Sequence, residues 1–556
     1  MTPRPIRLGL LLDSYELARW EYVLLDRLMT SRGASINLVV LNAGPTTRPG
    51  LVRRVLTNWR YLVFALYTRL DARLFDVQPN AFATTDAAAL LQEVPSLSVT
   101  PVSTKFSDRF DAEDIRAIGR YDLDLLLRFG LRILRGDILT VARHGVWSYH
   151  HGDNRVNRGG PAGFWEVFEQ WDTTGSILQI LSEDLDAGKV LYRSTAQTDK
   201  RSVHRNRNTY YWKSVSFVPR VIRKLHDAGS DAFLDRVEEQ NRGVDVYSSR
   251  LFTVGRLTNL KMLALLTTHG LRLLRDLWIR ACFVEQWTLF YAFTNRAFPM
   301  SLRRFTPIVP PRDRFFPDPF PVQHDHRRYI FIEEYVYRSR KGHISVIEVD
   351  ADGHHRAPVT VLDAPHHLSY PFIVKHGDDY FMIPESGSNR TIDIYRCLEF
   401  PFKWEFYMHL MEGVEAYDAT LFFHDRRWWL FATIVEQPGA SSLDELFLFH
   451  APALLTTAWT PHPLNPIVSD VRRARPAGAI FIHEGRIVRP SQDSSKRYGR
   501  AITLHEIRTL NEREYEEVEL QSIEAHWAPR LVATHTLNRG GRLTVVDGNI
   551  RRSRLF

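Results

Sequence analysis

Short apolar runs alternate with longer helical patterns along the first two hundred residues. Apolar runs of four to eight residues bounded by turn residues are typical of buried strands, and apolar residues at intervals of three or four are typical of amphipathic helices. Strands that alternate with helices favour a doubly wound α/β domain with a parallel sheet. We predict such a domain over 1–204, with strands at 6–12, 35–44, 121–130 and 144–153 and helices at 15–31, 51–75 and 131–144.

From about residue 304 the pattern changes to short strands with no helices between them. The strands come in triplets, and the units begin near residues 318, 370, 418, 477 and 534, which are 52, 48, 59 and 57 residues apart. Strand units that repeat about every 50 residues are typical of propeller blades. We therefore predict an all-β five-bladed propeller over 303–556. A strand near 303–309 is expected to complete the last blade, which would leave no free edge.

The segment between these parts, 205–302, is rich in Arg and Leu and lacks the Gly, Ser and Pro tracts of a flexible linker. We predict a mostly helical connector. Within it, 261–283 has leucines at helical spacing interrupted by charged residues, which indicates an amphipathic helix rather than a transmembrane segment. Packing against a domain is the favoured use of this helix, and peripheral contact with a membrane is the alternative.

Composition narrows the class of protein. The 556 residues carry a formal net charge of +8, with 44% hydrophobic and 24% charged residues, as in soluble globular proteins. The basic residues are scattered, so we expect no nucleic-acid partner. Cys282 and Cys397 lie too far apart for a metal motif, and we expect a reducing, cytoplasmic location and no metal. The first apolar run is broken by Asp13 and is too short for the core of a signal peptide.

A polar loop follows the predicted strand at 144–153. It contains the adjacent histidines His150 and His151, and a later segment contains Asp186 directly before Ala-Gly. Ligands of open α/β sheets bind outside the carboxyl ends of the strands. A histidine and a carboxylate that meet there would form an acid/base pair.

These motifs resemble the folate-dependent formyltransferases over roughly 1–200. The matching residues are His150, Arg158-Gly159, Thr174-Gly175 and Asp186-Ala187-Gly188. The resemblance implies formyl transfer from 10-formyltetrahydrofolate to an amine. It implies that His150 with Ser148 stabilises the oxyanion and that Asp186 relays the proton of the amine. The residues expected at the cofactor are Phe129, Gly130, Arg158, Gly159 and Gly160.

The sequence departs from this family at one important position. Ser148 stands where the family has Asn, and His151 stands where it usually has Pro. Loss of one oxyanion donor costs about 3–4 kcal/mol in the transition state, and a serine hydroxyl has a shorter reach than an amide. Three options stay open: weakened formyl transfer, a different acyl donor, or a site that binds without catalysis.

Polar residues recur where the inner strands of the predicted propeller begin. Acids across several blades are found in arabinanase- and invertase-like glycosidases, which use paired carboxylates, whereas Asp-Pro is also ordinary turn chemistry. The segments 366–374, 380–386, 428–434 and 475–481 resemble the propeller that precedes the glycosyltransferase domain of plant glucosamine inositolphosphorylceramide transferases. The residues expected to bind a saccharide are Asp318, Tyr370, Glu385, Asp418 and His535.

The hypothesis that uses both parts is an enzyme of surface-polysaccharide or glycoconjugate assembly. Its first domain would formylate or otherwise acylate an amino sugar, and its propeller would hold the saccharide. The alternatives are a glycan-processing enzyme centred on the propeller, with a degenerate formyltransferase domain, and a glycan-binding protein without catalysis.

Overall fold

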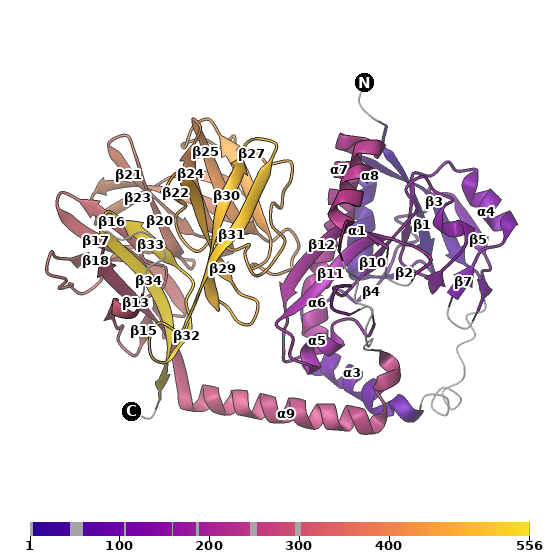
Figure 1. Ribbon diagram of the computed structural model, residues 1–556, viewed down its shortest axis with the longest axis horizontal. Coiled ribbons are helices and arrows are strands. Elements are labelled where there is room, and N and C mark those ends of the chain that lie inside the picture. The colour runs from indigo at the N-terminus through magenta and orange to yellow at the C-terminus, as the bar shows by residue number, and fades with distance from the viewer. Residues whose placement is uncertain are drawn as a thin grey trace. The chain divides into compact units, whose positions relative to one another are not determined.

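The computed structural model describes residues 4–44, 59–104, 107–157, 159–184, 188–244, 253–294 and 302–554 (Figure 1). The chain divides into two compact units. The first comprises Met1–Leu271 with Gln437–Ser441, and the second comprises Arg272–Glu436 with Ser442–Phe556.

The first unit is built on a seven-stranded sheet in the order β12-β11-β10-β8-β1-β3-β5. The strands from β10 to β5 run parallel, and β11 and β12 are antiparallel at one edge. It is an α/β domain with a mostly parallel sheet. The strands are β1 (Ile6–Leu12), β3 (Ala34–Asn42), β5 (Ser96–Val99), β8 (Leu125–Arg128), β10 (Val146–His150), β11 (Thr173–Ile180) and β12 (Lys189–Gln197).

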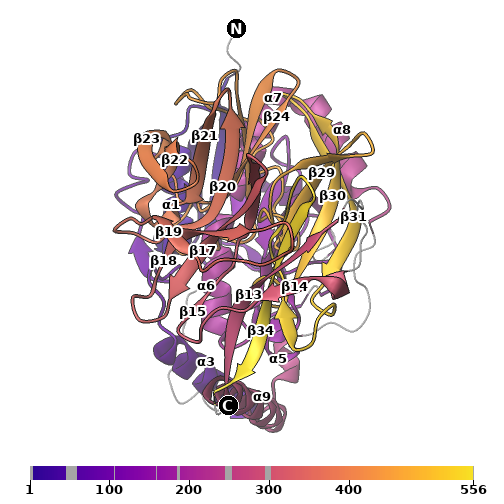
Figure 2. The ribbon, with the colours of Figure 1, turned by 90° about the vertical axis from the view of Figure 1, so that its left-hand side faces the viewer.

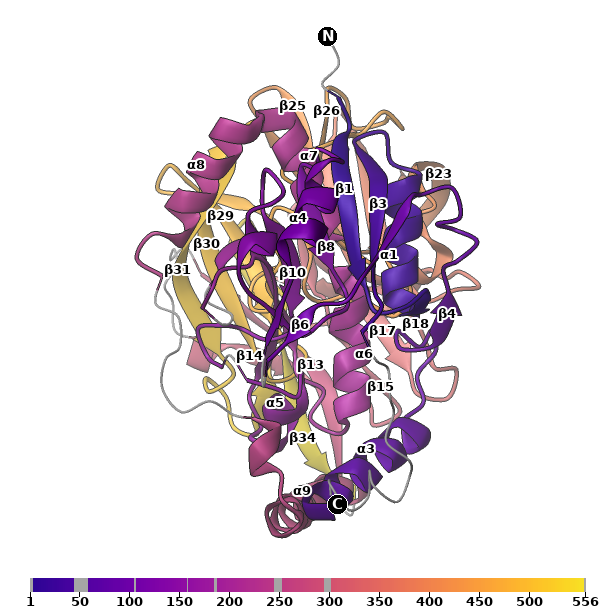
Figure 3. The same cartoon turned by 90° about the vertical axis from the view of Figure 1, so that its right-hand side faces the viewer.

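Two apolar layers cover the faces of this sheet, because successive side chains of a strand point to opposite faces. Leu10 and Leu127 pack into the layer that contains α1, α6, α7 and α8. Leu11 and Leu126 pack into the layer that contains α4, and Figure 3 shows α4 and α1 beside the parallel strands. The helices are α1 (Arg19–Met29), α3 (Leu62–Leu74), α4 (Ala112–Gly119), α5 (Phe164–Phe168), α6 (Val203–Ser214), α7 (Phe217–Ala228), α8 (Ser230–Asn241) and α9 (Asn259–Cys282).

The predicted helix at 131–144 is wrong. This segment contains the short strand β9 (Ile133–Leu134) and a 3-10 turn, Asp137–Leu139. Leu131 has φ +65 and Gly136 has φ +82, and left-handed residues interrupt an α-helix. β9 runs parallel to β7 (Ser107–Arg109).

The segment 205–302 contributes elements to both units. Tyr210, Val221 and Phe233, from α6, α7 and α8, lie in the core of the first unit. The residues after α9 form a strand, β13 (Phe283–Phe293), in a sheet of the second unit. The predicted helical character is therefore wrong for 283–293. Its β-branched and aromatic residues suit a strand. Among the helices that the structure describes, none has both the length and the apolar character to cross a bilayer.

The second unit is all β, and its described residues form five successive antiparallel sheets (Figure 2). Each predicted triplet corresponds to a sheet, although its first strand is short in the fourth sheet. Four sheets comprise β15 (Arg314–Phe315) to β19 (Val359–Leu362); β20 (Ser369–His376) to β23 (Lys403–Glu412); β24 (Ala416–His424) to β27 (Thr460–Pro461); and β28 (Phe481–His483) to β31 (Tyr515–Glu524). The fifth comprises β13, β14 (Thr306–Ile308), β32 (Leu531–Ala533), β33 (Leu537–Gly540) and β34 (Leu543–Ser553).

The fifth sheet joins strands from the beginning and the end of this unit. β13 pairs with β34 along its whole length, from Phe283 opposite Ser553 to Phe293 opposite Leu543. The predicted strand near 303–309 is present as β14, which pairs with the other edge of β13. The main partner of β34 is thus β13.

Replacing Leu289 by Ala tests the assignment of 283–293 as a buried strand. Leu289 is fully buried in β13, so we expect Leu289→Ala to lower the free energy of unfolding of the second unit by about 2–5 kcal/mol. Urea unfolding followed by tryptophan fluorescence measures this. Val309 is 52% exposed, so the control Val309→Ala should change stability by less than about 0.5 kcal/mol. Equal effects of the two variants would contradict the assignment.

Candidate functional site

Three of the predicted saccharide-binding residues share an unusual backbone conformation. Asp318, Tyr370 and Asp418, at the start of three successive sheets, have φ values of +53, +43 and +51. The strand register shifts between Ser369 and Phe372 and between Tyr417 and Thr420, which marks bulges that redirect side chains out of the ladder. Left-handed non-glycine residues cost about 1–3 kcal/mol each and concentrate at functional sites.

Arg475 joins the carboxylates of two predicted residues. Its Nε and Nη2 donate to Oδ2 and Oδ1 of Asp418 at 2.6 and 3.1 Å. Nη2 also donates to Oε2 of Glu385 at 2.9 Å, and Gln492 Nε2 donates to Asp418 at 2.9 Å. The side chains of Arg475, Glu385 and Asp418 are 9%, 8% and 3% exposed. A buried bidentate pair of this kind fixes the orientation of all its members.

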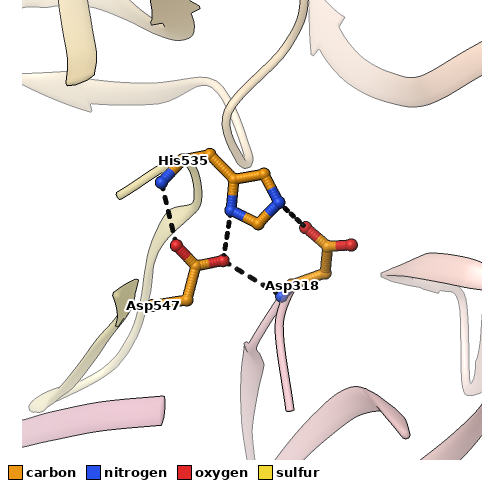
Figure 4. A group of neighbouring side chains, drawn as sticks. All are labelled: Asp318, His535 and Asp547. Carbon is orange, nitrogen blue, oxygen red and sulfur yellow. Dashed lines mark hydrogen bonds and ion pairs between the residues drawn. The ribbon is translucent and has the colours of Figure 1, made fainter. Parts of the chain in front are cut away.

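The predicted residues Asp318 and His535 form a second group with Asp547 (Figure 4). His535 Nδ1 lies 2.6 Å from Oδ2 of Asp547, and Nε2 lies 3.5 Å from Oδ1 of Asp318. Asp547 also accepts hydrogen bonds from the backbone N–H groups of Asp318, His535 and Thr536, at 3.2, 2.9 and 3.1 Å. The imidazole is therefore held between two carboxylates.

Burial dominates the ionisation of these groups. It raises the pKa of Asp318 to about 6, and it raises the pKa of Glu385 and of the neighbouring Glu333 well above their ordinary values. Burial lowers the pKa of His535, but the carboxylates of Asp547 and Asp318 outweigh it and leave that pKa raised. Carboxyl groups with raised pKa values beside a cationic imidazole and guanidinium can donate and accept protons near neutral pH.

Tyr370 completes the set. Its hydroxyl accepts the N–H of Gly478 at 2.9 Å and lies 2.8 Å from Oγ1 of Thr420. Gly478 begins the fourth sheet with φ +133. The structure thus brings four of the five predicted residues into two buried groups, and Thr420 links Tyr370 to the backbone oxygen of Asp418. The charges of both His535 and Asp418 affect the pKa of Asp318.

Sequence reasoning missed Arg475, Asp547 and Glu333. Arg475 had a signal, because it opens the fourth repeat, in which Gly478 takes the place of the aspartate or tyrosine of earlier repeats. Asp547 lies inside the last strand, and Glu333 lies inside β17 (Arg327–Val336). An acid within a strand is usually on the exposed face, so neither position stood out.

Asp318, His535 and Asp547 also offer three ligand atoms within 4.8 Å of one another. Carboxylate and imidazole ligands suit a divalent transition metal. The oxygens of Asp547, however, already accept three backbone N–H groups and lie beside the imidazole. The three residues are thus joined to one another by ion pairs and by hydrogen bonds to backbone N–H groups.

In the α/β domain, the carboxyl ends of β8 and β10 carry Arg128, Ser148 and His150. Ser148 is 2% exposed, and Arg128 Nη1 donates to its hydroxyl at 3.1 Å. Arg128 Nη2 donates to the carbonyl oxygens of Leu131 and Arg132 at 2.8 and 2.9 Å. Arg128 was not predicted, because an arginine at the end of a strand is ordinary. It brings a cationic donor to the place where the expected amide donor is missing.

His150 lies two residues beyond Ser148 on the same face of β10. Its Nε2 is 3.5 Å from the carbonyl oxygen of Asn157, and a Cβ on Gly152 would come within 2.8 Å of it. Asn157 and Gly152 line a cavity of about 90 Å³. The cavity wall also includes Gly159 and Glu166.

His151 faces the opposite side and lines the same cavity. Its ring stacks on Tyr211, with centroids 3.6 Å apart, and its Nδ1 lies 3.1 Å from Oγ of Ser176. Burial, together with the positive charges of His150 and Arg207, holds the pKa of His151 well below its ordinary value. His151 is therefore a neutral imidazole at neutral pH.

Glu166 is the acidic group of this cavity. It lies on α5 and is 7% exposed, and burial raises its pKa to about 7. A carboxyl group with this pKa exchanges its proton under physiological conditions. Sequence reasoning missed it because it lies in an aromatic helix, FWEVF, that read as core.

The remaining predicted residues have different positions. Gly159 lines the cavity, and the carbonyl oxygen of Gly160 accepts the indole N–H of Trp165 at 3.3 Å. Phe129 packs edge-to-face on Trp20. Gly130 lies against the backbone of Asp13, where a Cβ would come within 2.4 Å of the amide nitrogen, so chain packing accounts for this glycine. Asp186 and Arg158 lie outside the described residues.

Comparison with known families gives a match for the second unit. The family described as glucosamine inositolphosphorylceramide transferase 1, N-terminal, matches residues 309–532. The transferase of that name from Oryza sativa subsp. japonica is 32% identical over 207 residues, 37% of this chain and 28% of the rice protein. The Arabidopsis thaliana protein is 30% identical over 238 residues, 42% and 29% of the two chains. The chain thus spans less than a third of the length of these relatives.

Solved structures resemble each unit at low similarity. Glycinamide ribonucleotide transformylase 1 from Symbiobacterium toebii covers 40% of this chain and 89% of its own, with 17% identity and a TM-score of 0.28. Zg3597, a family 117 glycoside hydrolase from Zobellia galactanivorans, covers 48% and 90%, with 9% identity and a TM-score of 0.32. Both likenesses are too distant to bear on activity.

Replacing Arg475 by Met tests the buried ionic group. The change leaves the carboxylates of Asp418 and Glu385 buried without their cation, which costs about 3–5 kcal/mol. We expect the loss in unfolding free energy to be larger at pH 8 than at pH 5. Burial raises the pKa of Glu385, so this carboxyl group escapes the penalty at pH 5 by taking up a proton. Urea unfolding at the two pH values measures this. Arg486 is exposed, and Arg486→Met should have little effect at either pH. Equal losses for the two variants would refute the structural role.

Glu166 gives the first unit a predictable pH dependence. The pKa is raised in the folded state from 4.5 to about 7, so its contribution to stability is fully present below pH 4.5 and is lost as pH rises through 7. We expect Glu166→Gln to be more stable than wild type at pH 8, by up to about 3 kcal/mol, and no more stable at pH 4.5. The exposed neighbour Glu169 provides the control Glu169→Gln. A Glu166→Gln variant with the pH profile of wild type would contradict burial of this carboxyl group.

Proposed function

We propose that this chain is a transferase of glycoconjugate assembly. Its α/β domain transfers a formyl or related acyl group to the amine of an amino sugar, and its second unit binds the saccharide. The observation that carries the proposal is the row of Arg128, Ser148 and His150 at the carboxyl ends of β8 and β10. Ligands of parallel α/β sheets bind at this edge.

The chemistry of the row suits acyl transfer. When an amine attacks a formyl carbon, negative charge develops on the carbonyl oxygen, and preorganised donors stabilise it. Ser148 already accepts a hydrogen bond from Arg128, so in this proposal Arg128 and His150 provide the stabilising charge and hydrogen bond. The amine gives up one proton, which Asp186 or Glu166 accepts. The bond between the formyl carbon and the nitrogen of the donor then breaks, and that nitrogen takes up a proton as it leaves.

The donor we propose is 10-formyltetrahydrofolate, which supplies the formyl group when bound. The cavity of about 90 Å³ is smaller than the ~300 Å³ or more of sites that enclose a drug-sized ligand. We propose that it takes the amine of the acceptor, with Gly159 and Asn157 on its wall. The formyl group and the rest of the donor then lie outside it, beside Arg128 and His150.

The second unit supports the saccharide side of the proposal. We propose that its five sheets are the blades of a propeller, since β20 contacts both β16 (Phe320–His324) and β24, and β16 contacts β33. In such a propeller, the groups around Arg475 and His535 would lie where the inner strands begin. Planar guanidinium and carboxylate groups are well suited to the hydroxyls of a sugar. The relatives that match this unit are named glucosamine inositolphosphorylceramide transferase 1.

A second candidate function is glycan binding or processing without acyl transfer. The engagement of the Ser148 hydroxyl by Arg128 favours it, because the position of the family's amide donor is then structural. In that case the chemistry lies with Asp318, Glu385 and His535.

Calorimetric titration with 5-formyltetrahydrofolate separates the two candidates. We expect micromolar binding to wild type, at least tenfold weaker binding to His150→Ala, and wild-type binding to the control His226→Ala, since His226 lies on α7. Arg128→Met should bind the analogue but transfer about 10²–10³-fold more slowly, as for loss of one oxyanion donor. Absence of binding by wild type at millimolar ligand would refute the folate proposal. Glycan binding that Asp318→Asn abolishes would then favour the second candidate.

A further inference from the structure

α3 and the first turns of α9 lie side by side in the first unit (Figures 1 and 3). The side chain of Asn259 accepts the N–H of Val63 at 3.0 Å and donates to the carbonyl oxygen of Trp59 at 2.8 Å. Val63 and Leu266 pack on the same apolar cluster. The pair is therefore a fixed part of the domain surface.

α9 presents apolar residues on two opposite faces. Met262 and His269 are buried, and Leu265 and Leu266 pack beside them. On the opposite face, Leu260, Leu263 and Leu271 are 82%, 51% and 63% exposed. Farther along the same helix, Leu274 and Trp278 are 63% and 60% exposed. A helix that only packed against its domain would carry polar residues on this second face.

α3 continues the exposed apolar surface. Its leucines recur every fourth residue and all point to solvent: Leu62, Leu66, Leu70 and Leu74 are 43%, 58%, 47% and 75% exposed. Trp59, just before the helix, is 60% exposed. Together with Leu260, Leu263 and Leu271, these residues form what we call the leucine surface. Exposed apolar residues grouped on neighbouring helices mark a site of interaction.

Within 59–74 and 259–271, the exposed charges have one sign. Arg60, Arg69, Arg73 and Lys261 are all exposed. The acidic residue within 59–74 is Asp71, which is buried and accepts the backbone N–H of His204, and 259–271 contains no acid. Exposed leucines and tryptophan bordered by arginine and lysine match the two layers of a membrane interface, with acyl chains below and anionic phosphates above.

We propose that the leucine surface docks the protein on a bilayer that carries anionic headgroups. The leucines and Trp59 enter the boundary between headgroups and acyl chains, and the arginines bind lipid phosphates, to which guanidinium is matched. This proposal is independent of the proposed function, because it concerns neither the cavity nor the buried ionic groups.

Sedimentation of the full chain with vesicles tests the proposal. We expect binding to vesicles of phosphatidylcholine and phosphatidylglycerol, and much weaker binding to phosphatidylcholine alone. Leu66→Ser with Leu263→Ser keeps the charge, and should weaken binding at least tenfold for each leucine. Arg69→Gln with Arg73→Gln should weaken binding about fivefold for each arginine. Circular dichroism identical to wild type establishes that the variants fold.

A matched control uses exposed apolar residues elsewhere. Ile482 and Phe423 are 66% and 54% exposed in the second unit, and Ile482→Ser with Phe423→Ser should bind vesicles as wild type does. Equal binding of the Leu66/Leu263 variant and wild type would overturn the proposal, as would absence of wild-type binding. A wild-type dimer without vesicles that this variant converts to monomer would identify the surface as a subunit interface and also overturn it.

Discussion

Removing the carboxylates of Asp418 and Glu385 from water is the constraint on which the second unit depends. Each buried ion costs several kcal/mol unless a partner offsets it, and Arg475 is the partner of both. Glu385 and Asp418 lie on β21 and β24, in two different sheets, and Arg475 lies in the segment that leads into a third. The ionic group therefore exists only when those sheets are in their final places, so the requirement that stabilises the site also fixes the arrangement of the sheets.

In the second group of this unit, too, one side chain joins residues from different sheets. Asp547 holds His535 by its ring and by its backbone, and holds Asp318 by its backbone N–H. Residues from the first and fifth sheets are thus joined through one carboxylate. In the α/β domain, by contrast, the polar residues collect at one edge of a single sheet, and the cavity beside them is small. The two units thus place their polar groups differently: the second unit buries carboxylates beside Arg475 and His535, and the α/β domain has Arg128 bonded to Ser148 at the carboxyl ends of its strands.

Repetition explains how much of the second unit could be predicted from its sequence. Asp318, Tyr370 and Asp418 stood out because they begin successive repeats, and a repeated bulge gives them the same left-handed backbone. Arg475 and Asp547 break or lie outside this repetition, so their partnership with the predicted residues appears only in three dimensions. Glu166 could not be predicted because its raised pKa results from burial of its side chain in the folded domain. The composition of its aromatic helix does not indicate this.

In the α/β domain, apolar runs located β1, β3, β8 and β10, because buried parallel strands are continuous in hydrophobicity. The failures have local and distant causes. The segment 131–144 was assigned as helix because a left-handed leucine, Leu131, leaves no mark in the sequence. The strand β13 was missed because what makes it a strand is its pairing with β34, far along the chain.

The pairing of β13 with β34 sets the order in which the second unit can fold during synthesis. Glu285 and Arg551, which form an ion pair across β13 and β34, are 266 residues apart. At ~5–20 residues per second, a ribosome takes about 13–50 seconds to supply this partner. Until then, the edge of β13 that will pair with β34 exposes backbone N–H and C=O groups, which can pair with a strand of another chain. The fifth sheet can therefore form only after β34 has been synthesised. The nascent chain is most prone to misassembly in the interval before this pairing.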